Sequence, residues 1–173
     1  MPLDRWRLPG GPRAGSIAGM HRVQTAAGPV GVWLPAGESL DDVDGIAYWS
    51  PNPRLGRFTV ISDEDPDGDA LLATERAHGE VELESDERSR RGGLDVRRVR
   101  YRVRRTEPRD LVVVGGERRH VGGALAEHIS DVLLIGDATA GARAGYSVRA
   151  DAPEELRAQF AEVLDRVRVG DEE

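Results

Sequence analysis

Cysteine and lysine are both missing from this chain of 173 residues. Without cysteine there is no disulfide, no thiolate nucleophile and no sulfur ligand for a metal. Without lysine a G-x-x-x-x-G-K-[ST] phosphate loop cannot form, and no G-x-G-x-x-G follows a strand-like segment. All 24 basic residues are arginines, which is typical of a bacterial genome with GC-rich codons.

Long apolar runs are also missing. No segment approaches the ~18–20 apolar residues that span a bilayer. Glycine and proline interrupt the region after Arg5 and Arg7, so no secretory signal is predicted. We therefore expect a cytoplasmic protein that does not contact a membrane.

The composition that remains, 39% hydrophobic and 32% charged, is typical of a soluble folded protein. Its length fits one domain. Residues 1–20 are rich in glycine, proline and arginine and predict a flexible N-terminal arm. Residues 21–170 are expected to form that single domain.

The net charge of -7 argues against a nucleic-acid-binding protein, which would normally be basic. The charge is uneven, because residues 88–110 carry 10 arginines and 3 acids. These arginines alternate with apolar residues, so the basic block predicts a strand in a sheet rather than a basic tail.

Residues 80–84 and 99–104 alternate polar and apolar with a period of two, which predicts a hairpin joined by a polar turn. One face would be apolar, with Val81, Leu83, Val99, Tyr101 and Val103. The other would face solvent, with Glu80, Glu82 and Glu84 beside Arg98, Arg100, Arg102 and Arg104. Opposite charges across neighbouring strands favour this register.

Short strands are predicted along most of the remaining chain. They cover residues 21–25, 29–34, 46–49, 57–61, 111–114, 117–121, 127–135 and 144–149, with a loop at 35–45 and glycine turns at 115–116 and 122–123.

Two helices are predicted. The first covers residues 70–77, with Asp67 or Asp69 as its N-cap and Gly79 at its end. The second starts at a capping box of Asp151 and Glu154, with Pro153 in its first turn. Its apolar face would contain Leu156, Phe160, Val163, Leu164 and Val167. Short turns between strands make the sheet mainly antiparallel, so we expect an α+β sandwich whose two helices cover one apolar face.

This order of elements resembles the PsbP-like α/β-sandwich superfamily. The segments that carry the resemblance are residues 97–103, Leu133-Leu134-Ile135, Gly145-Tyr146-Ser147-Val148 and a proline-started helix with Phe160 and Val163-Leu164. The likeness spans about residues 21–169 and involves element order alone. Members of that group mostly act as binding or adaptor domains, so the resemblance implies the same role here.

The acidic segment 63–69 matches the first half of an EF-hand loop, which supplies oxygen ligands to Ca²⁺. Its twelfth position is Thr74 instead of the bidentate glutamate, and Pro66 stiffens the turn. A solvated loop leading into a helix is the preferred interpretation. Metal or small-molecule binding, through this loop or a pocket between sheet and helices, is the alternative.

The histidines are not spaced as metal ligands. They are His21, His78, His120 and His128. In a strand, His128 and Ser130 would lie on one face and Asp131 on the other, so the three cannot form a catalytic triad. We expect no catalytic residue, no metal and no cofactor.

The sharpest candidate binding site is the arginine stripe of residues 98, 100, 102 and 104, with Arg118, Arg119 and His120 nearby in sequence. It could contact an acidic partner, unless the glutamates opposite neutralise it. Trp33, Tyr48 and Trp49 are interpreted as core residues. The sequence thus predicts a non-enzymatic protein-binding domain, with self-association into a homodimer as the first expectation.

Overall fold

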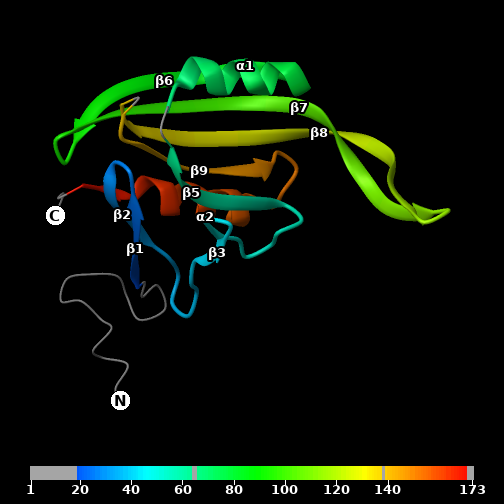
Figure 1. Ribbon diagram of the computed structural model, residues 1–173, viewed down its shortest axis with the longest axis horizontal. Helices are drawn as coiled ribbons and strands as arrows, with labels where there is room; N and C mark the ends of the chain where they lie inside the picture. Colours follow the sequence, from blue (N-terminus) through cyan, green and yellow to red (C-terminus); the bar gives the residue numbers. More distant parts are fainter. Residues whose placement is uncertain (1–18, 64–65, 138, 171–173) are drawn as a thin grey trace.

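The computed structural model describes residues 19–63, 66–137 and 139–170, with only the backbone at residue 63 and in segments 107–114 and 117–124. Figure 1 shows the elements in chain order. They are β1 (Met20–Thr25), β2 (Gly28–Trp33), β3 (Asp41–Val43), β4 (Ile46–Trp49), β5 (Gly56–Asp63), α1 (Gly68–His78), β6 (Glu80–Arg91), β7 (Leu94–Val114), β8 (Glu117–Gly136), β9 (Gly141–Arg149), α2 (Glu154–Asp165) and β10 (Arg168–Val169).

The strands form two antiparallel sheets, which confirms the predicted antiparallel character. Seven strands form the large sheet in the order β3-β4-β5-β9-β8-β7-β6. The small sheet has the order β1-β2-β10, and its β2 contributes the buried residues Val30 and Val32 to the core. The two-residue strand β10 pairs with β2 and was not predicted.

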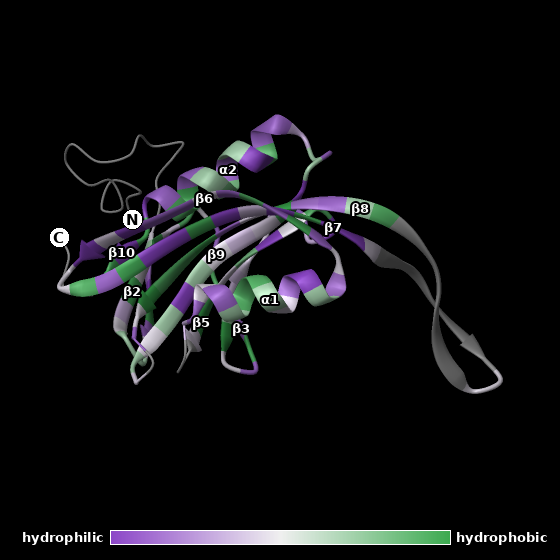
Figure 2. Cartoon of the chain, turned by 90° about the horizontal axis from the view of Figure 1, so that it is seen from above, coloured by the Kyte–Doolittle hydropathy of each residue, from purple (hydrophilic) through white to green (hydrophobic). Residues whose placement is uncertain are grey.

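Both faces of the large sheet are covered, whereas the sequence predicts one apolar face under both helices. Along β8, Val132 and Leu134 pack with Leu72 of α1 in one buried cluster. The alternate residues Leu133 and Ile135 belong to a second cluster with Phe160 of α2. Successive side chains of a strand point to opposite faces, so the two helices lie on opposite sides of the sheet, as Figure 2 shows.

The first helix begins as predicted. The Asp67 carboxylate accepts a hydrogen bond from the backbone N–H of Asp69 at 2.9 Å, and Gly79 ends the helix. This cap satisfies one of the backbone donors that a helix start leaves free.

The predicted capping box of the second helix is wrong. Pro153 occupies the N-cap position and provides no side-chain hydrogen bond. Asp151 lies two residues before the cap, and its carboxylate accepts two hydrogen bonds from Arg149, both at 2.9 Å. The apolar face of this helix is as predicted, with Phe160, Val163 and Leu164 buried.

Two predicted turns and one predicted loop are also wrong. The predicted loop at 35–45 contains the short strand β3. The hairpin strands β6 and β7 run on to a turn at Gly92 and Gly93, both with positive φ. Gly122-Gly123 does not break β8, because Gly123 pairs with Pro108 of β7. Proline is tolerated on a strand with a free edge, where its missing N–H removes no ladder bond.

Candidate interaction surface

The predicted hairpin of alternating charge is confirmed as β6 and β7. Glu80 pairs with Arg104 and Glu82 with Arg102, so these four side chains share one face. The register shifts between Leu83 and Ser85, which leaves Glu84 as the extra residue of a bulge. A bulge re-aims the side chain at the inserted position.

Glu84 uses this position to bind two arginines. Its carboxylate accepts hydrogen bonds from Nε of Arg100 at 2.9 Å and from Nε of Arg102. The hydrogen bond from Arg102 is the main reason that the pKa of Glu84 lies below its ordinary value. Within the described part of the chain, Glu80 and Glu82 make no ion pair, so the predicted ladder is concentrated on one glutamate.

Arg98 at the other end of the stripe is tied into the fold. Its guanidinium donates two hydrogen bonds to Asp131 of β8, at 2.9 and 2.7 Å. It also pairs with Asp165 at the end of α2, at 2.9 Å. The Asp131 side chain is 1% exposed and that of Arg98 is 27% exposed. The stripe was predicted to face solvent, but this end lies against the second helix.

Asp131 also explains the electrostatics of this end. The bidentate hydrogen bond to Asp131 is the main reason that the pKa of Arg98 is raised above its ordinary value. A buried carboxylate needs such a partner, because an unpaired charge is costly away from water. Arg98 therefore joins β7, β8 and α2, and its charge is already used inside the molecule.

Arg104 differs from the other three arginines of the stripe. It is exposed, and among the described residues it makes no ion pair. Its neighbour Arg105 pairs with Glu75 of α1 at 3.4 Å. The stripe thus leaves one guanidinium available to a partner, at the position where β6 ends its pairing with β7.

Beyond Arg104 the strands β7 and β8 continue as a pair. Strand β6 pairs with β7 as far as Arg104, and β9 pairs with β8 from His128 onward. The β7–β8 ladder goes on from Arg105 opposite Ala126 to Val114 opposite Glu117. Residues 105–126 therefore form a two-stranded segment, the distal ribbon, that no third described strand joins. Figure 1 shows it projecting past the rest of the domain.

The sequence held a signal for this ribbon that strand prediction missed. Residues 111–114 are Leu-Val-Val-Val and residues 118–121 are Arg-Arg-His-Val, separated by a short glycine turn. These two runs were predicted as separate short strands, but they are the ends of the two longest strands.

The root of the ribbon is packed tightly against the end of the first helix. A Cβ atom at Gly79 would overlap the carbonyl oxygen of Arg104. Only glycine allows the backbone to approach so closely. The junction between α1 and β6 thus lies directly on β7 where the ribbon begins.

His128, Ser130 and Asp131 do not come together as a catalytic triad. His128 and Ser130 lie on the face of β8 opposite to Asp131, as predicted from strand alternation. The hydroxyl of Ser130 donates to the hydroxyl of Ser147 at 3.2 Å. His78 contacts the carbonyl oxygen of Thr74, a local contact within α1. The His120 side chain is outside the described part.

Metal ligands do not gather either. Within the described ranges, no group of three or more His, Cys, Asp or Glu side chains could hold a metal ion. Residues 64 and 65 of the acidic loop, and the side chain of Asp63, lie outside the described part. Of the remaining loop carboxylates, Asp67 caps α1 and Asp69 pairs with Arg97 at 3.1 Å.

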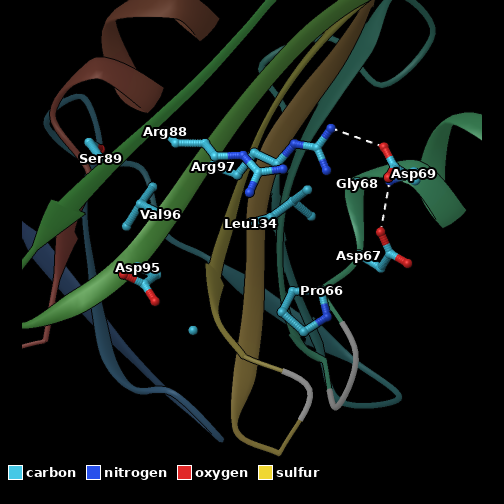
Figure 3. A pocket seen from close by; sticks show the side chains of 11 residues that line it. Pro66, Asp67, Gly68, Asp69, Arg88, Ser89, Asp95, Val96, Arg97 and Leu134 are labelled. Atoms are coloured by element: carbon cyan, nitrogen blue, oxygen red, sulfur yellow. Dashed lines mark hydrogen bonds and ion pairs between the residues drawn. The ribbon is translucent and has the colours of Figure 1, made fainter.

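A pocket of about 500 Å³ lies where α1 begins, over β6, β7 and β8. Its residues are shown in Figure 3, where Arg97 reaches toward Asp69. Arg97 also donates two hydrogen bonds to Asp86, at 2.9 and 2.7 Å. These bonds lower the pKa of Asp86 and neutralise the arginine. The pocket is polar and mixed in charge, with Asp67, Asp95 and Arg88 on its wall.

The aromatic residues divide between core and surface. Trp49 is buried and meets Phe160 edge-on, with ring centroids 5.4 Å apart, as a core role predicts. Trp33 and Tyr48 are half-buried, and each lies under an arginine, Arg166 at 5.3 Å and Arg57 at 5.4 Å. Such stacking occupies the ring faces that a partner would contact.

Comparison with known proteins does not place the chain in a family. A scan against protein-family models finds no match, and a search of curated proteins finds no significant relative.

None of the helices in the described ranges has the length and apolarity needed to cross a membrane.

Proposed function

We propose that this chain is a non-catalytic protein-binding domain whose contact element is the distal ribbon, residues 105–126, with Arg104 at its root. The observation that carries the proposal is the pairing pattern: β7 and β8 continue together after β6 and β9 have ended. A two-stranded hairpin without further strands or a covering helix is only marginally stable in water.

The composition of the ribbon points to a partner that covers it. Four successive apolar residues, 111–114, lie on one of its strands, and Leu125 near its root is 62% exposed. An exposed apolar side chain such as that of Leu125 gains free energy when a partner removes it from water. Both outer edges of the ribbon also lack a described neighbour, so a partner strand can add to either edge.

The arginine stripe contributes through one residue in this proposal. Arg98, Arg100 and Arg102 are held by carboxylates of the same chain, whereas Arg104 is exposed beside the ribbon. An acidic group on the partner would pair with Arg104. The resemblance in element order to the PsbP-like superfamily, whose members mostly act as binding domains, points in the same direction.

Shortening the ribbon tests the proposal. Thr106 pairs with Leu125, so residues 107–124 can be replaced by Asn-Gly, which favours a two-residue hairpin turn. We expect the shortened protein to fold, and to lose the proteins that cross-linking identifies on the unmodified chain in cell extract. Arg54→Ala, an exposed arginine on another surface, is the control and should retain them. Capture of the same proteins without the ribbon would refute the proposal.

The pocket at the start of α1 favours a second candidate function, small-molecule or metal binding next to the acidic loop 63–69. Its volume is within the range of small-molecule sites. Calorimetry with Ca²⁺ separates the candidates: binding heat that Asp65→Ala removes would support this second function. Absence of heat with the unmodified protein would exclude a calcium role.

A further inference from the structure

The outer edge of β6 is the free end of the large sheet. Strand β6 is last in the order of seven strands and pairs only with β7 among the described strands. Its side chains are exposed along almost the whole strand, from Glu80 to Arg91. An exposed edge strand presents a row of unpaired N–H and C=O groups, to which another strand can add.

The charges along β6 reverse from one end to the other. Its first eight residues carry five acids and its last four carry three arginines. They are Glu80, Glu82, Glu84, Asp86 and Glu87, followed by Arg88, Arg90 and Arg91. A second β6 placed antiparallel would bring the acidic end of each strand beside the basic end of the other. A parallel arrangement would place like charges together, which is unfavourable.

Part of this pattern remains available for a partner. Glu84 and Asp86 are bound to arginines of β7, and Arg90 makes an exposed pair with Asp95 at 3.4 Å. In the described part of the chain, the other acids and arginines of the strand make no ion pair. These are Glu80, Glu82, Glu87, Arg88 and Arg91. When the charges that are paired within the chain are left out, β6 still carries acids toward its start and arginines toward its end.

The bulge at Glu84 adds selectivity. Charged side chains and bulges are the devices by which an edge strand rejects unspecific strands. A strand is accepted here only when its own charges run in the complementary order. A second copy of this chain provides that order. When two β6 strands overlap fully, a two-fold axis places Glu80 opposite Arg91 at both ends, while Glu84, which arginines of β7 already bind, faces Glu87.

We propose that β6 pairs antiparallel with β6 of a second copy, so that the two large sheets join into one continuous sheet across a two-fold axis. This dimer does not depend on the distal ribbon. The ribbon remains free in the dimer to bind a different protein.

Reversing the charges at the two ends of the strand tests the dimer by analytical ultracentrifugation. One variant carries Glu80→Arg, Glu82→Arg and Glu87→Arg, and the other carries Arg88→Glu, Arg90→Glu and Arg91→Glu. We expect each variant alone to dimerise at least tenfold more weakly than the unmodified protein. Mixed in equal amounts, the two should form a heterodimer, because one edge is then mainly basic, keeping only the internally paired Glu84 and Asp86, and the other is all acidic.

The opposite sheet edge provides a matched control. Asp41→Arg with Asp42→Arg reverses charge on β3, the other terminal strand, and should leave the dimer unchanged. The unmodified protein gives a second measurement that needs no substitution. Its dimer dissociation constant should rise severalfold between about 0.05 and 0.5 M NaCl, since salt screens exposed charges.

Several results would overturn the proposal. A monomeric unmodified protein would do so, as would dimers that persist in both charge-reversed variants or a mixture that fails to associate. The ribbon-shortened protein distinguishes the two proposals, because it should remain a dimer even where partner capture is lost. Loss of the dimer on shortening the ribbon would place the interface there and exclude β6.

Discussion

The β7–β8 ladder contains two regions with the same hydrogen bonding and very different surroundings. In the inner region, β6 and β9 flank the pair, and the clusters of α1 and α2 cover its two faces. In the distal ribbon, residues 105–126, no described strand flanks the pair. The comparison shows that backbone pairing extends further than the layers that stabilise it. Hydrogen bonds hold the ribbon together, whereas apolar burial holds the inner region in place.

One substitution made at two positions of β8 gives the largest expected contrast. Leu133 is fully buried in the inner region, while Leu125 near the root of the ribbon is exposed. Leu133→Ala should reduce the free energy of unfolding by about 3 kcal/mol, because it removes buried methyl groups and leaves a cavity. Leu125→Ala should change it by less than about 0.5 kcal/mol. Urea unfolding followed by circular dichroism measures both, and equal losses would mean that the ribbon is packed as firmly as the core.

A second contrast concerns the two ends of the arginine stripe. Arg98→Met leaves the carboxylate of Asp131 buried without its partner, so we expect a loss of about 3 kcal/mol in the free energy of unfolding. Arg102→Met removes a largely exposed pair with Glu84 and should cost less than about 1 kcal/mol. Urea unfolding of the two variants provides the comparison. A smaller loss for Arg98 than for Arg102 would contradict the assignment of Arg98 to the fold.

The smallest expected effect is a pH dependence at the bulge. The pKa of Glu84 is held below its ordinary value of 4.5, chiefly by Arg102. Folding therefore favours the ionised form, so its contribution to stability is complete above about pH 4.5 and is lost as the pH falls below it. Glu84→Gln should remove this part of the acid sensitivity between pH 5 and pH 3, by less than about 1 kcal/mol. Unfolding midpoints in urea at the two pH values measure it, with Glu82→Gln as the control that keeps it.

Local patterns in the sequence predicted the elements that depend on neighbouring residues. The two faces of β6 and β7 follow from alternation, and Asp67 and Gly79 mark the ends of α1. These features depend on contacts within a few residues or across one hairpin. The antiparallel character of the sheet follows from the short turns.

Features that depend on distant residues were not predictable in the same way. Arg98 and Asp131 are 33 residues apart, so a polar position that looks solvated in sequence is buried by a partner from another strand. Alternation also does not reveal whether a helix packs over the polar face of a strand. Here α2 contacts the face of β7 that carries Arg98, so both faces of the sheet are covered. Alternation also did not predict the bulge at Glu84. The extra residue places the Glu84 side chain where it binds both Arg100 and Arg102.

The close approach of Gly79 to Arg104 has a mechanical consequence. The carbonyl oxygen of Arg104 lies beside Gly79, where a Cβ atom would overlap it, and Arg105 is joined to Glu75 on α1. A pull on the tip of β7 and β8 would therefore be transmitted to α1 at this junction. A load on the projecting strands would therefore strain the contact at Gly79 and the ion pair of Arg105 with Glu75, together with the sheet that β7 and β8 continue into.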